Sequence, residues 1–283
     1  MQALLFRTFV ILLLGLSVVL GVFAYWAVRT AGETRVAFLD VGQGDAILIS
    51  RGPNQVLIDG GRSGKTLLSA LSRQVPFWDR TIETVIATHP DADHIGGFPE
   101  LFARYGVGAY LDNGMRSESK VFALLAERRA ASGVETILAR RGLSVTFPEG
   151  GTLSVLYPNG EAGFPNANVG SVVSRFSFGE TDFLLTGDLP EEERYLSDPG
   201  DTDILKVSHH GSKYSTSAAF LHSVRPEETV ISVGKNSYGH PDAEVLARLA
   251  EAGVAVYRTD RLGDIVYRCV TLDDSCHPVG VAP

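Results

Sequence analysis

The chain has 283 residues, of which 45% are hydrophobic and 20% charged, and this ordinary globular composition provides enough apolar residues for a sizeable core. The length fits a single α/β sandwich or barrel of about 200–250 residues with a further segment added. The formal net charge of −8 excludes a generally basic nucleic-acid-binding surface. It does not exclude a nucleic-acid substrate, because bound cations would make a site locally positive.

The first part of the chain predicts a membrane-spanning helix. An uncharged stretch dominated by Leu, Val, Phe and Ile occupies residues 8–28, between Arg7 and Arg29. At about 1.5 Å per residue, a helix of this length spans a hydrocarbon core of roughly 30 Å. Tyr25 and Trp26 near its end are typical of an interfacial aromatic anchor. We therefore expect a single pass through the membrane by this stretch.

A cleaved signal peptide is the alternative for the same stretch. Its apolar region is normally only about 7–15 residues long and is followed by a small-x-small cleavage site. The bulky aromatic pair before Ala27 disfavours such a site, whereas the spacing of Ala27 and Ala31 leaves it open. We expect residues 1–30 to form an anchor or signal segment and residues 31–283 to form a separate domain.

Apolar periodicity and turn residues divide the remaining chain into strands and helices in two similar halves. The strands are expected at residues 35–39, 46–50, 56–58, 84–88, 143–147, 152–157, 172–178, 181–185, 204–207, 229–233, 254–259 and 264–268. The helices are expected at 64–75, 98–105, 119–132, 190–196, 216–223 and 242–252. Ser119 is a candidate N-cap, and Gly179-Glu180 predicts a tight hairpin turn. Two β-sheets packed face to face, with helices on the outer faces, accommodate this order.

The densest group of metal-binding residue types follows the strand expected at residues 84–88. Four potential ligands lie within six residues: His89, Asp91, Asp93 and His94. The loop would lie at the carboxyl end of its strand, where α/β proteins place their chemistry. Imidazole and carboxylate groups together suit a first-row divalent ion, and two clustered sets of them suit a pair of ions. A polar turn with two surface histidines is the alternative explanation.

Three further strands end in groups that can bind metal. Asp59 follows the third expected strand and precedes two glycines that permit a sharp turn. Asp188 ends a second such strand, and the adjacent His209 and His210 end a third. A turn carboxylate explains any one of these residues equally well. Four strand ends of this kind, in this order, predict a shared metal site.

In these residues the sequence resembles the metallo-β-lactamase fold hydrolases, whose signature is an early strand-end Asp, a His-x-His-x-Asp-His loop, a later His, a bridging Asp and a final His. Within that superfamily it is similar to the ComEC-type competence proteins. The motifs that carry the similarity are Phe38-Leu39-Asp40-Val41-Gly42-Gln43-Gly44-Asp45, His89-Pro90-Asp91-Ala92-Asp93-His94, Leu184-Leu185-Thr186-Gly187-Asp188, Val207-Ser208-His209-His210-Gly211-Ser212 and Tyr238-Gly239-His240-Pro241. The resemblance covers roughly residues 35–268. It implies an α/β fold, a four-layer αββα metallo-β-lactamase sandwich preceded here by one transmembrane helix.

The resemblance also implies a site for two divalent metal ions. One ion would be held by His89, Asp91 and Asp188, and the other by Asp93, His94, Asp188 and His210, with Asp188 bridging. Two such ions activate a water molecule and stabilise the attacking and leaving oxygens of a hydrolysis. Asp59 and Asn168 are expected to orient ligands rather than to bind metal.

The chain departs from the general superfamily pattern at two places. Asp91 stands where a second histidine is usual, and residues 166–171 offer only Asn and Ser where another His ligand is common. Both changes are similar to what ComEC-type domains show. A carboxylate in place of an imidazole makes the first metal position harder, so we expect manganese to be preferred over zinc, with zinc as the alternative.

Candidate catalytic and substrate-binding residues surround the expected ligands. Those expected in catalysis are Asp93, His209 and His240, and those expected to bind substrate are Lys213, Ser215 and Tyr238. From a strand end only one of His209 and His210 can readily point at a given ion. We assign His210 to the metal and His209 to the substrate or leaving group, with the reverse left open. An ordinary loop histidine also explains His240, and a solvated helix start also explains Lys213 and Ser215.

The two cysteines bear on the compartment of the domain. Cys269 and Cys276 are close enough in sequence for a local disulfide in an oxidising compartment, and two free thiols are the alternative. Together with an uncleaved anchor, a disulfide favours a domain outside the cytoplasmic membrane. Arg7 and Arg29 place similar positive charge on the two sides of the stretch, so the positive-inside rule alone does not set its orientation.

These inferences predict a membrane-anchored metallohydrolase of phosphodiester bonds, with DNA as the expected substrate. The alternatives are hydrolysis of a smaller phosphodiester or other ester, and a non-catalytic subunit that docks on a DNA-uptake channel. ComEC-type proteins carry a channel-forming portion, whereas this chain has one candidate span, so DNA transport would require a separate channel protein. The sequence sets no oligomeric state.

Overall fold

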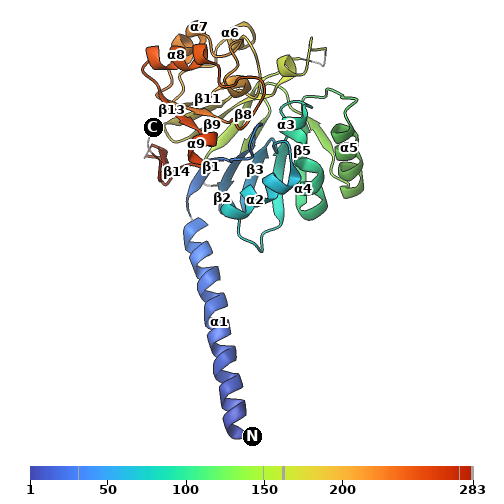
Figure 1. Ribbon diagram of the computed structural model, residues 1–283, viewed down its shortest axis with the longest axis vertical. Coiled ribbons are helices and arrows are strands. Elements are labelled where there is room, and N and C mark those ends of the chain that lie inside the picture. The colour runs from blue at the N-terminus through green and yellow to red at the C-terminus, as the bar shows by residue number, and fades with distance from the viewer. Residues whose placement is uncertain (31, 149, 161–162, 274, 282–283) are drawn as a thin grey trace.

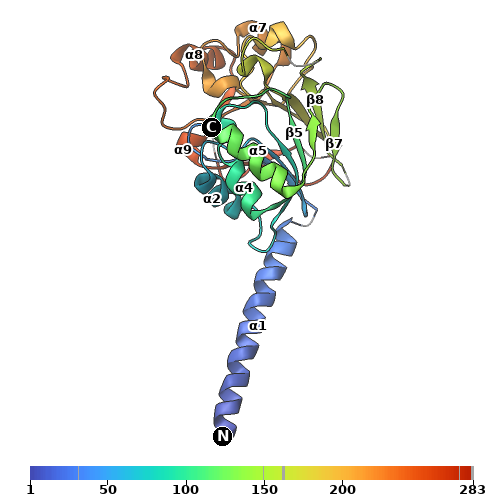
Figure 2. The ribbon, with the colours of Figure 1, turned by 90° about the vertical axis from the view of Figure 1, so that its right-hand side faces the viewer.

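The structure, a computed structural model, describes residues 1–283 apart from positions 31, 149, 161–162, 274 and 282–283, and leaves the side chains of residues 3 and 26–30 undescribed. Helix α1 (Gln2–Thr30) projects away from a globular part that follows it (Figure 1, Figure 2). Its segment Leu4–Tyr25 is long and apolar enough to cross a membrane and is not buried in the globular part. The expected domain boundary at residue 31 falls outside the described residues and stays a prediction, as does the interfacial role of the Trp26 side chain.

Two mixed sheets build the globular part within the described residues. The first has the strand order β15 (His277–Pro278), β14 (Ile265–Cys269), β1 (Thr34–Phe38), β2 (Ile47–Arg51), β3 (Asn54–Ile58), β4 (Thr81–Ile86), β5 (Gly106–Asp112) and β6 (Thr136–Leu138). The second has the order β13 (Ala255–Arg258), β12 (Glu228–Ile231), β11 (Ile204–Lys206), β10 (Thr181–Leu185), β9 (Val173–Phe178), β8 (Thr152–Tyr157) and β7 (Ser144–Thr146).

Helices cover the outer face of each sheet. The first half contributes α2 (Gly64–Gln74), α3 (Ala92–Ile95), α4 (Phe98–Arg104) and α5 (Lys120–Ser132), and the second contributes α6 (Glu192–Tyr195), α7 (Ala218–Val224), α8 (Ala243–Glu251) and α9 (Thr259–Leu262). Two short 3₁₀ segments, η1 (Asn168–Gly170) and η2 (Ser208–Gly211), lie at loop positions. The predicted four-layer αββα arrangement is confirmed (Figure 1).

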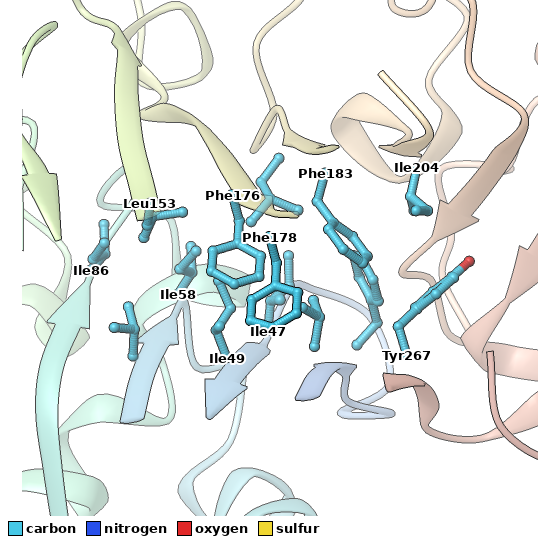
Figure 3. Close-up of a cluster of buried hydrophobic side chains, with 14 of the residues drawn as sticks. Ile47, Ile49, Ile58, Ile86, Leu153, Phe176, Phe178, Phe183, Ile204 and Tyr267 are labelled. Atoms are coloured by element: carbon cyan, nitrogen blue, oxygen red, sulfur yellow. The ribbon is translucent and has the colours of Figure 1, made fainter. Parts of the chain in front are cut away.

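Side-chain alternation along the strands produces the layers. In β1, Val36 and Phe38 join the core between the sheets, whereas Ala37 joins the cluster under α2 and α4. Figure 3 shows Phe176 and Phe178 of the second sheet near Ile47 and other isoleucines of the first. Each fully buried side chain of this size contributes about 1.5–3 kcal/mol, so this central layer supplies much of the stability of the domain.

Most predicted elements exist, with ends shifted by a few residues. Ser119 caps α5 by accepting a hydrogen bond from the N–H of Phe122 at 3.3 Å, and β9 and β10 form the predicted hairpin. Strand β5 was not predicted, because Gly106 and Gly108 weaken the strand signal. A disulfide joins Cys269 to Cys276, the first of the two alternatives for this pair.

The topology gathers the candidate functional loops at one edge. β3 and β4 are adjacent and parallel in the first sheet, as are β10 and β11 in the second. Their carboxyl ends therefore meet where the two sheets face each other. The loops after these four strands carry the strand-end residues singled out from the sequence.

Candidate metal centre

The loop after β4 presents four of the expected ligands. The chain turns from Ile86 into the short helix α3, with Asp91 at its N-cap position. His89 and His94 are buried. The side chains of Asp91 and Asp93 are 48% and 19% exposed, so they lie nearer to solvent than the two rings do.

The loop after β1 packs directly on α3. The N–H of Asp45 donates to the carbonyl of Asp93 at 3.3 Å, and Gly44 before it has a φ of 123°. A Cβ at Gly44 would lie 2.0 Å from the Asp93 carbonyl oxygen. Only glycine permits both this conformation and this approach, and the approach brings Asp45 under the loop that carries the expected ligands.

Hydrogen bonds fix the two rings of this loop through their Nδ1 atoms. Asp59, held at a positive φ of 60°, accepts from the N–H of Thr88 at 2.8 Å and from its hydroxyl at 2.7 Å. The same carboxylate accepts from Nδ1 of His94 at 2.7 Å. Because the Thr88 hydroxyl proton goes to Asp59, its oxygen accepts from Nδ1 of His89 at 3.0 Å. When these rings are neutral, their protons therefore lie on Nδ1, and their Nε2 atoms carry the free lone pairs.

The two histidines after β11 lie in a left-handed turn. His209 and His210 have φ values of 49° and 54°, which residues with a Cβ adopt only where the surrounding structure enforces them. Nδ1 of His210 donates to the carbonyl of Ser232 at 2.9 Å. Adjacent side chains point apart in a strand, but in this turn both rings reach Asp188, with Nε2–Oδ2 distances of 3.7 Å and 3.4 Å.

Asp188, after β10, is the common neighbour of the rings. Its Oδ2 also lies 3.2 Å from Nε2 of His94 and 3.9 Å from Nε2 of His89. Its N–H donates to the hydroxyl of Ser171 at 3.1 Å, and that hydroxyl lies 3.4 Å from Nδ1 of His89. Neither Thr88 nor Ser171 was expected at the site, since a lone hydroxyl after a strand carries no pattern of its own.

The described residues contain four overlapping groups of possible ligand atoms, and two of them include the expected ligands alone. One contains His89, His94 and Asp188, the other Asp93, His94 and His210, and within each group the atoms lie within 4.8 Å of one another. Asp91 joins the first side, with Oδ2 3.6 Å from Nε2 of His89. The structure thus brings together all six residues expected to bind metal.

The unsatisfied atoms of this cluster fit a cation. The Nε2 atoms of His89, His94 and His210 and Oδ1 of Asp188 are buried and have no hydrogen-bond partner among the described residues. With the protons on Nδ1, the Nε2 lone pairs face carboxylate oxygens, an arrangement of acceptors against acceptors that is unfavourable without a positive charge between them. The imidazole and carboxylate donors suit a first-row divalent ion.

Without metal, protons balance part of the carboxylate charge. Burial opposes charge on both rings, but Asp188 and Asp59 raise the pKa of His94 well above 6.5, and Asp188 and Asp45 raise that of His210 to about 9. Burial opposes the charge of Asp188 too, yet the two rings hold its pKa well below 3.8. A divalent ion would take the place of these protons.

A buried ion pair beneath the ligands was missed from the sequence. Lys206 on β11 is fully buried, and its ammonium contacts Oδ2 of Asp45, donates to the carbonyl of Gly187 at 2.7 Å and lies 3.8 Å from Oδ1 of Asp188. Burial opposes both charges, but the attraction of the pair raises the pKa of Lys206 and lowers that of Asp45 to about 2. The position of Lys206 inside an apolar strand could have indicated this ion pair, since a buried charge requires a partner.

A row of polar and aromatic side chains leads from Asp188 toward solvent. Nδ2 of Asn168 lies 3.5 Å from Nε2 of His209. The ring centre of His209 is 5.6 Å from that of His240, and the ring of Tyr238, 64% exposed, stacks on His240 at 5.8 Å. The structure thus places the expected substrate-side residues His209, His240 and Tyr238 side by side, with Asn168, expected to orient a ligand, beside His209.

Two other candidates lie outside this row. Lys213 is exposed, and its ammonium sits 5.1 Å from the ring centre of Tyr214. Ser215 is buried, and its hydroxyl donates to the carbonyls of Ser208 and Ser212 at 2.9 Å and 2.8 Å. The hydroxyl of Ser215 is thus engaged by the backbone of the histidine turn.

Comparison with known proteins identifies relatives of this domain. The family model described as the Metallo-beta-lactamase superfamily matches residues 39–235. ComE operon protein 3 of Bacillus subtilis is 34% identical, covering 89% of this chain and 35% of the relative. Competence protein ComA of Neisseria gonorrhoeae is 29% identical, covering 83% and 32%. The chain spans about a third of the length of these two relatives, and the expected similarity to ComEC-type proteins is confirmed.

Solved structures share the fold at low sequence identity. YhfI of Bacillus subtilis, described as a metallo-beta-lactamase fold protein, has a TM-score of 0.59 and 14% identity over 84% of this chain and 100% of its own. CmlA of Streptomyces venezuelae, a diiron β-hydroxylase, has a TM-score of 0.53 and 14% identity over 85% of this chain and 55% of its own. At such identities the likeness concerns the fold alone.

Proposed function

We propose, because this chain belongs to the metallo-β-lactamase superfamily, that it is a membrane-anchored, metal-dependent hydrolase of phosphodiester bonds. Members of this superfamily are usually metal-dependent hydrolases. The observation that carries the proposal is the convergence of three buried Nε2 atoms on Asp188 without hydrogen-bond partners in the described part of the chain. We also propose the division into an anchor, residues 1–30, and a hydrolase domain, residues 31–283.

Charge balance supports two divalent ions. With neutral histidines, five carboxylates and one ammonium leave a net charge of −4 at the site: Asp45, Asp59, Asp91, Asp93, Asp188 and Lys206. Two divalent ions would neutralise this charge, one held by His89, Asp91 and Asp188 and the other by Asp93, His94, Asp188 and His210. Bound there, they would supply an activated water and stabilise the oxygens of a phosphodiester during hydrolysis.

The residues around the ligands would orient them and contact the substrate. Asp59 and Ser232 already hold the rings of His94 and His210 in place, so metal binding needs no turning of either ring. Burial lowers the pKa values of His209 and His240, which keeps both rings neutral at pH 7. Each neutral ring retains one N–H that can donate to a phosphate oxygen or the leaving group.

DNA is the substrate that we propose. One relative is named a competence protein, and another, from Haemophilus influenzae, is named Recombination protein 2. Tyr238 offers an exposed aromatic face beside the histidine row, and such a face can stack on a nucleic-acid base. A DNA channel is the partner that we propose for this domain in DNA uptake.

We place the domain on the outer side of the cytoplasmic membrane. The apolar helix α1 supports anchoring. The disulfide between Cys269 and Cys276 supports an oxidising compartment for the domain.

Hydrolysis assays with the purified full chain test this proposal. The chain, in detergent with manganese, is incubated with single-stranded DNA, duplex DNA and a small aryl phosphodiester. We expect cleavage of DNA, and a loss of more than about 100-fold in Asp93→Ala, because that variant lacks one metal ligand. Cleavage of the small diester alone would favour the small-substrate alternative.

Asp198→Ala is the matched control. Asp198 is an exposed carboxylate outside the metal cluster, so its removal is expected to leave cleavage unchanged. Circular dichroism of both variants checks that the fold is retained. Full activity in Asp93→Ala, or none in the unmodified chain with metal bound, would contradict a catalytic role.

A further inference from the structure

The loop between α2 and β4, residues 75–80, presents exposed aromatic surface. Phe77 is 65% exposed, whereas the phenylalanines of the two sheets are buried. The rings of Phe77 and Trp78 meet edge to face at 4.9 Å. We call this segment the aromatic loop. An exposed phenylalanine beside a half-buried tryptophan is typical of a surface that contacts a partner or a membrane.

The aromatic loop touches the candidate membrane span. The ring of Trp78 stacks on that of Phe23 with centres 4.1 Å apart. Phe23 lies within the apolar segment Leu4–Tyr25, two residues before its end. At about 1.5 Å per residue, Trp78 is therefore level with a point only about 3 Å inside the end of the span.

Other apolar groups lie at the same edge of the first sheet. Strand register pairs Thr34, the first residue after the anchor to enter the sheet, with Cys269. The chain that continues from Cys269 exposes Val270 by 51% and Val279 by 43%. These side chains extend the apolar surface beside the anchor.

The helix leaves open space beside this edge. A cavity of about 630 Å³ lies between α1 and the domain, lined by Ala24 and Tyr25 on one side and by Glu33, Arg35, Arg268 and Val279 on the other. Arg268 is paired with Glu33 there, and long side chains with an apolar stem and a polar head are typical of the boundary between hydrocarbon and headgroups.

We propose that the aromatic loop inserts into the interfacial region of the bilayer from which α1 emerges, so that the domain rests on the membrane. Tryptophan and tyrosine concentrate at this depth because their rings are apolar while one edge donates hydrogen bonds. The metal cluster then faces away from the membrane. Along β1, Thr34 lies at the membrane end and Phe38 at the metal-site end. The four residues of strand between these two ends correspond to a separation of roughly 13 Å.

Quenching by brominated lipid tests the proposal in the full chain. The sequence has two tryptophans, so Trp26→Phe leaves Trp78 as the reporter after reconstitution into phosphatidylcholine–phosphatidylglycerol vesicles. We expect lipids brominated near the headgroup end of the acyl chain to lower Trp78 emission by about half or more. In Phe77→Asp this quenching should fall markedly, because the charge draws the loop into water.

Two further single-tryptophan variants provide the controls. Trp78→Phe leaves Trp26 to report on the anchor itself. Trp26→Phe with Trp78→Phe and Tyr238→Trp places the reporter at the metal-site edge, where we expect no quenching. Quenching of Trp26 without quenching of Trp78 would overturn the proposal. The proposal would also be overturned if neither aqueous iodide nor brominated lipid quenched Trp78 emission, since protein would then cover the aromatic loop.

Discussion

Removal of the buried Lys206 ammonium is expected to destabilise the domain strongly. Lys206→Met keeps the length of the side chain but leaves the Asp45 carboxylate buried without the cation that it contacts. It also removes the donor to the Gly187 carbonyl. Asp45 cannot relax into solvent, because the loop that carries it is packed on α3 through Gly44.

The magnitude follows from the charges involved. Two unit charges about 4 Å apart attract by about 4 kcal/mol at an effective dielectric constant of about 20. Removing one partner of a buried ion pair costs about 3–5 kcal/mol in measured cases. At about 2–4 °C per kcal/mol for a domain of this size, the unfolding midpoint should fall by roughly 6–20 °C.

Unfolding of the metal-free full chain in detergent, followed by circular dichroism, measures this loss. In Lys206→Met with Asp45→Asn, both charges are gone, and we expect at least half of the lost stability to return. Lys213→Met removes an exposed lysine from the following loop and should change stability by less than about 0.5 kcal/mol. A loss below about 1 kcal/mol in Lys206→Met, or a double variant less stable than the single one, would contradict a stabilising role of the Lys206–Asp45 pair.

Four other outcomes are expected. Burial raises the pKa of Glu192 from 4.5 to about 7, so between these pH values the folded chain keeps a proton that the unfolded chain has released. The free energy of unfolding should therefore fall by up to about 3 kcal/mol as pH rises through this window. Denaturation at several pH values measures this fall, and the same fall in Glu192→Gln would show that another group causes it. Metal-free protein reconstituted with manganese should turn over faster than protein reconstituted with zinc, and Asp91→His should narrow or reverse this difference in rate. Faster turnover with zinc in the unmodified chain would contradict the preference of the Asp91 position for a hard metal ion. His94→Ala should abolish hydrolysis while its circular dichroism spectrum stays native, and retained activity would exclude its role as a ligand. The chain should stay with membranes after carbonate washing, and release into the soluble fraction would indicate cleavage of α1.

The layers and the outline of the site could be predicted because they depend on local patterns. His89 to His94 lie within six residues, so their spacing alone indicates a shared site. Asp59 follows a strongly apolar strand, and the end of such a strand is recognisable. Strand β5 was missed since its residues have weak strand propensity, and its pairing with β4 comes from the sheet rather than from its own sequence.

Long-range contacts account for the rest of what the sequence did not predict. Asp45 and Lys206 come from different sheets, and no local pattern joins them. Their pairing follows from the packing of the two sheets at one edge. The shared orientation of His209 and His210 depends on a left-handed turn that the sequence signals only by Gly211 after it. Tertiary structure imposes both features.

A manganese titration of metal-free protein tests whether the cluster around Asp188 is a dinuclear catalytic centre. The full chain is stripped with a chelator, manganese is added in steps, and hydrolysis of an aryl phosphodiester is followed beside the bound-metal content. We predict no turnover without metal, a rise that saturates near two equivalents per chain, and no rise in Asp188→Asn, which lacks the bridging carboxylate charge. Full turnover in the metal-free chain, or none at any manganese concentration, would contradict the assignment of this site as a dinuclear phosphodiesterase centre.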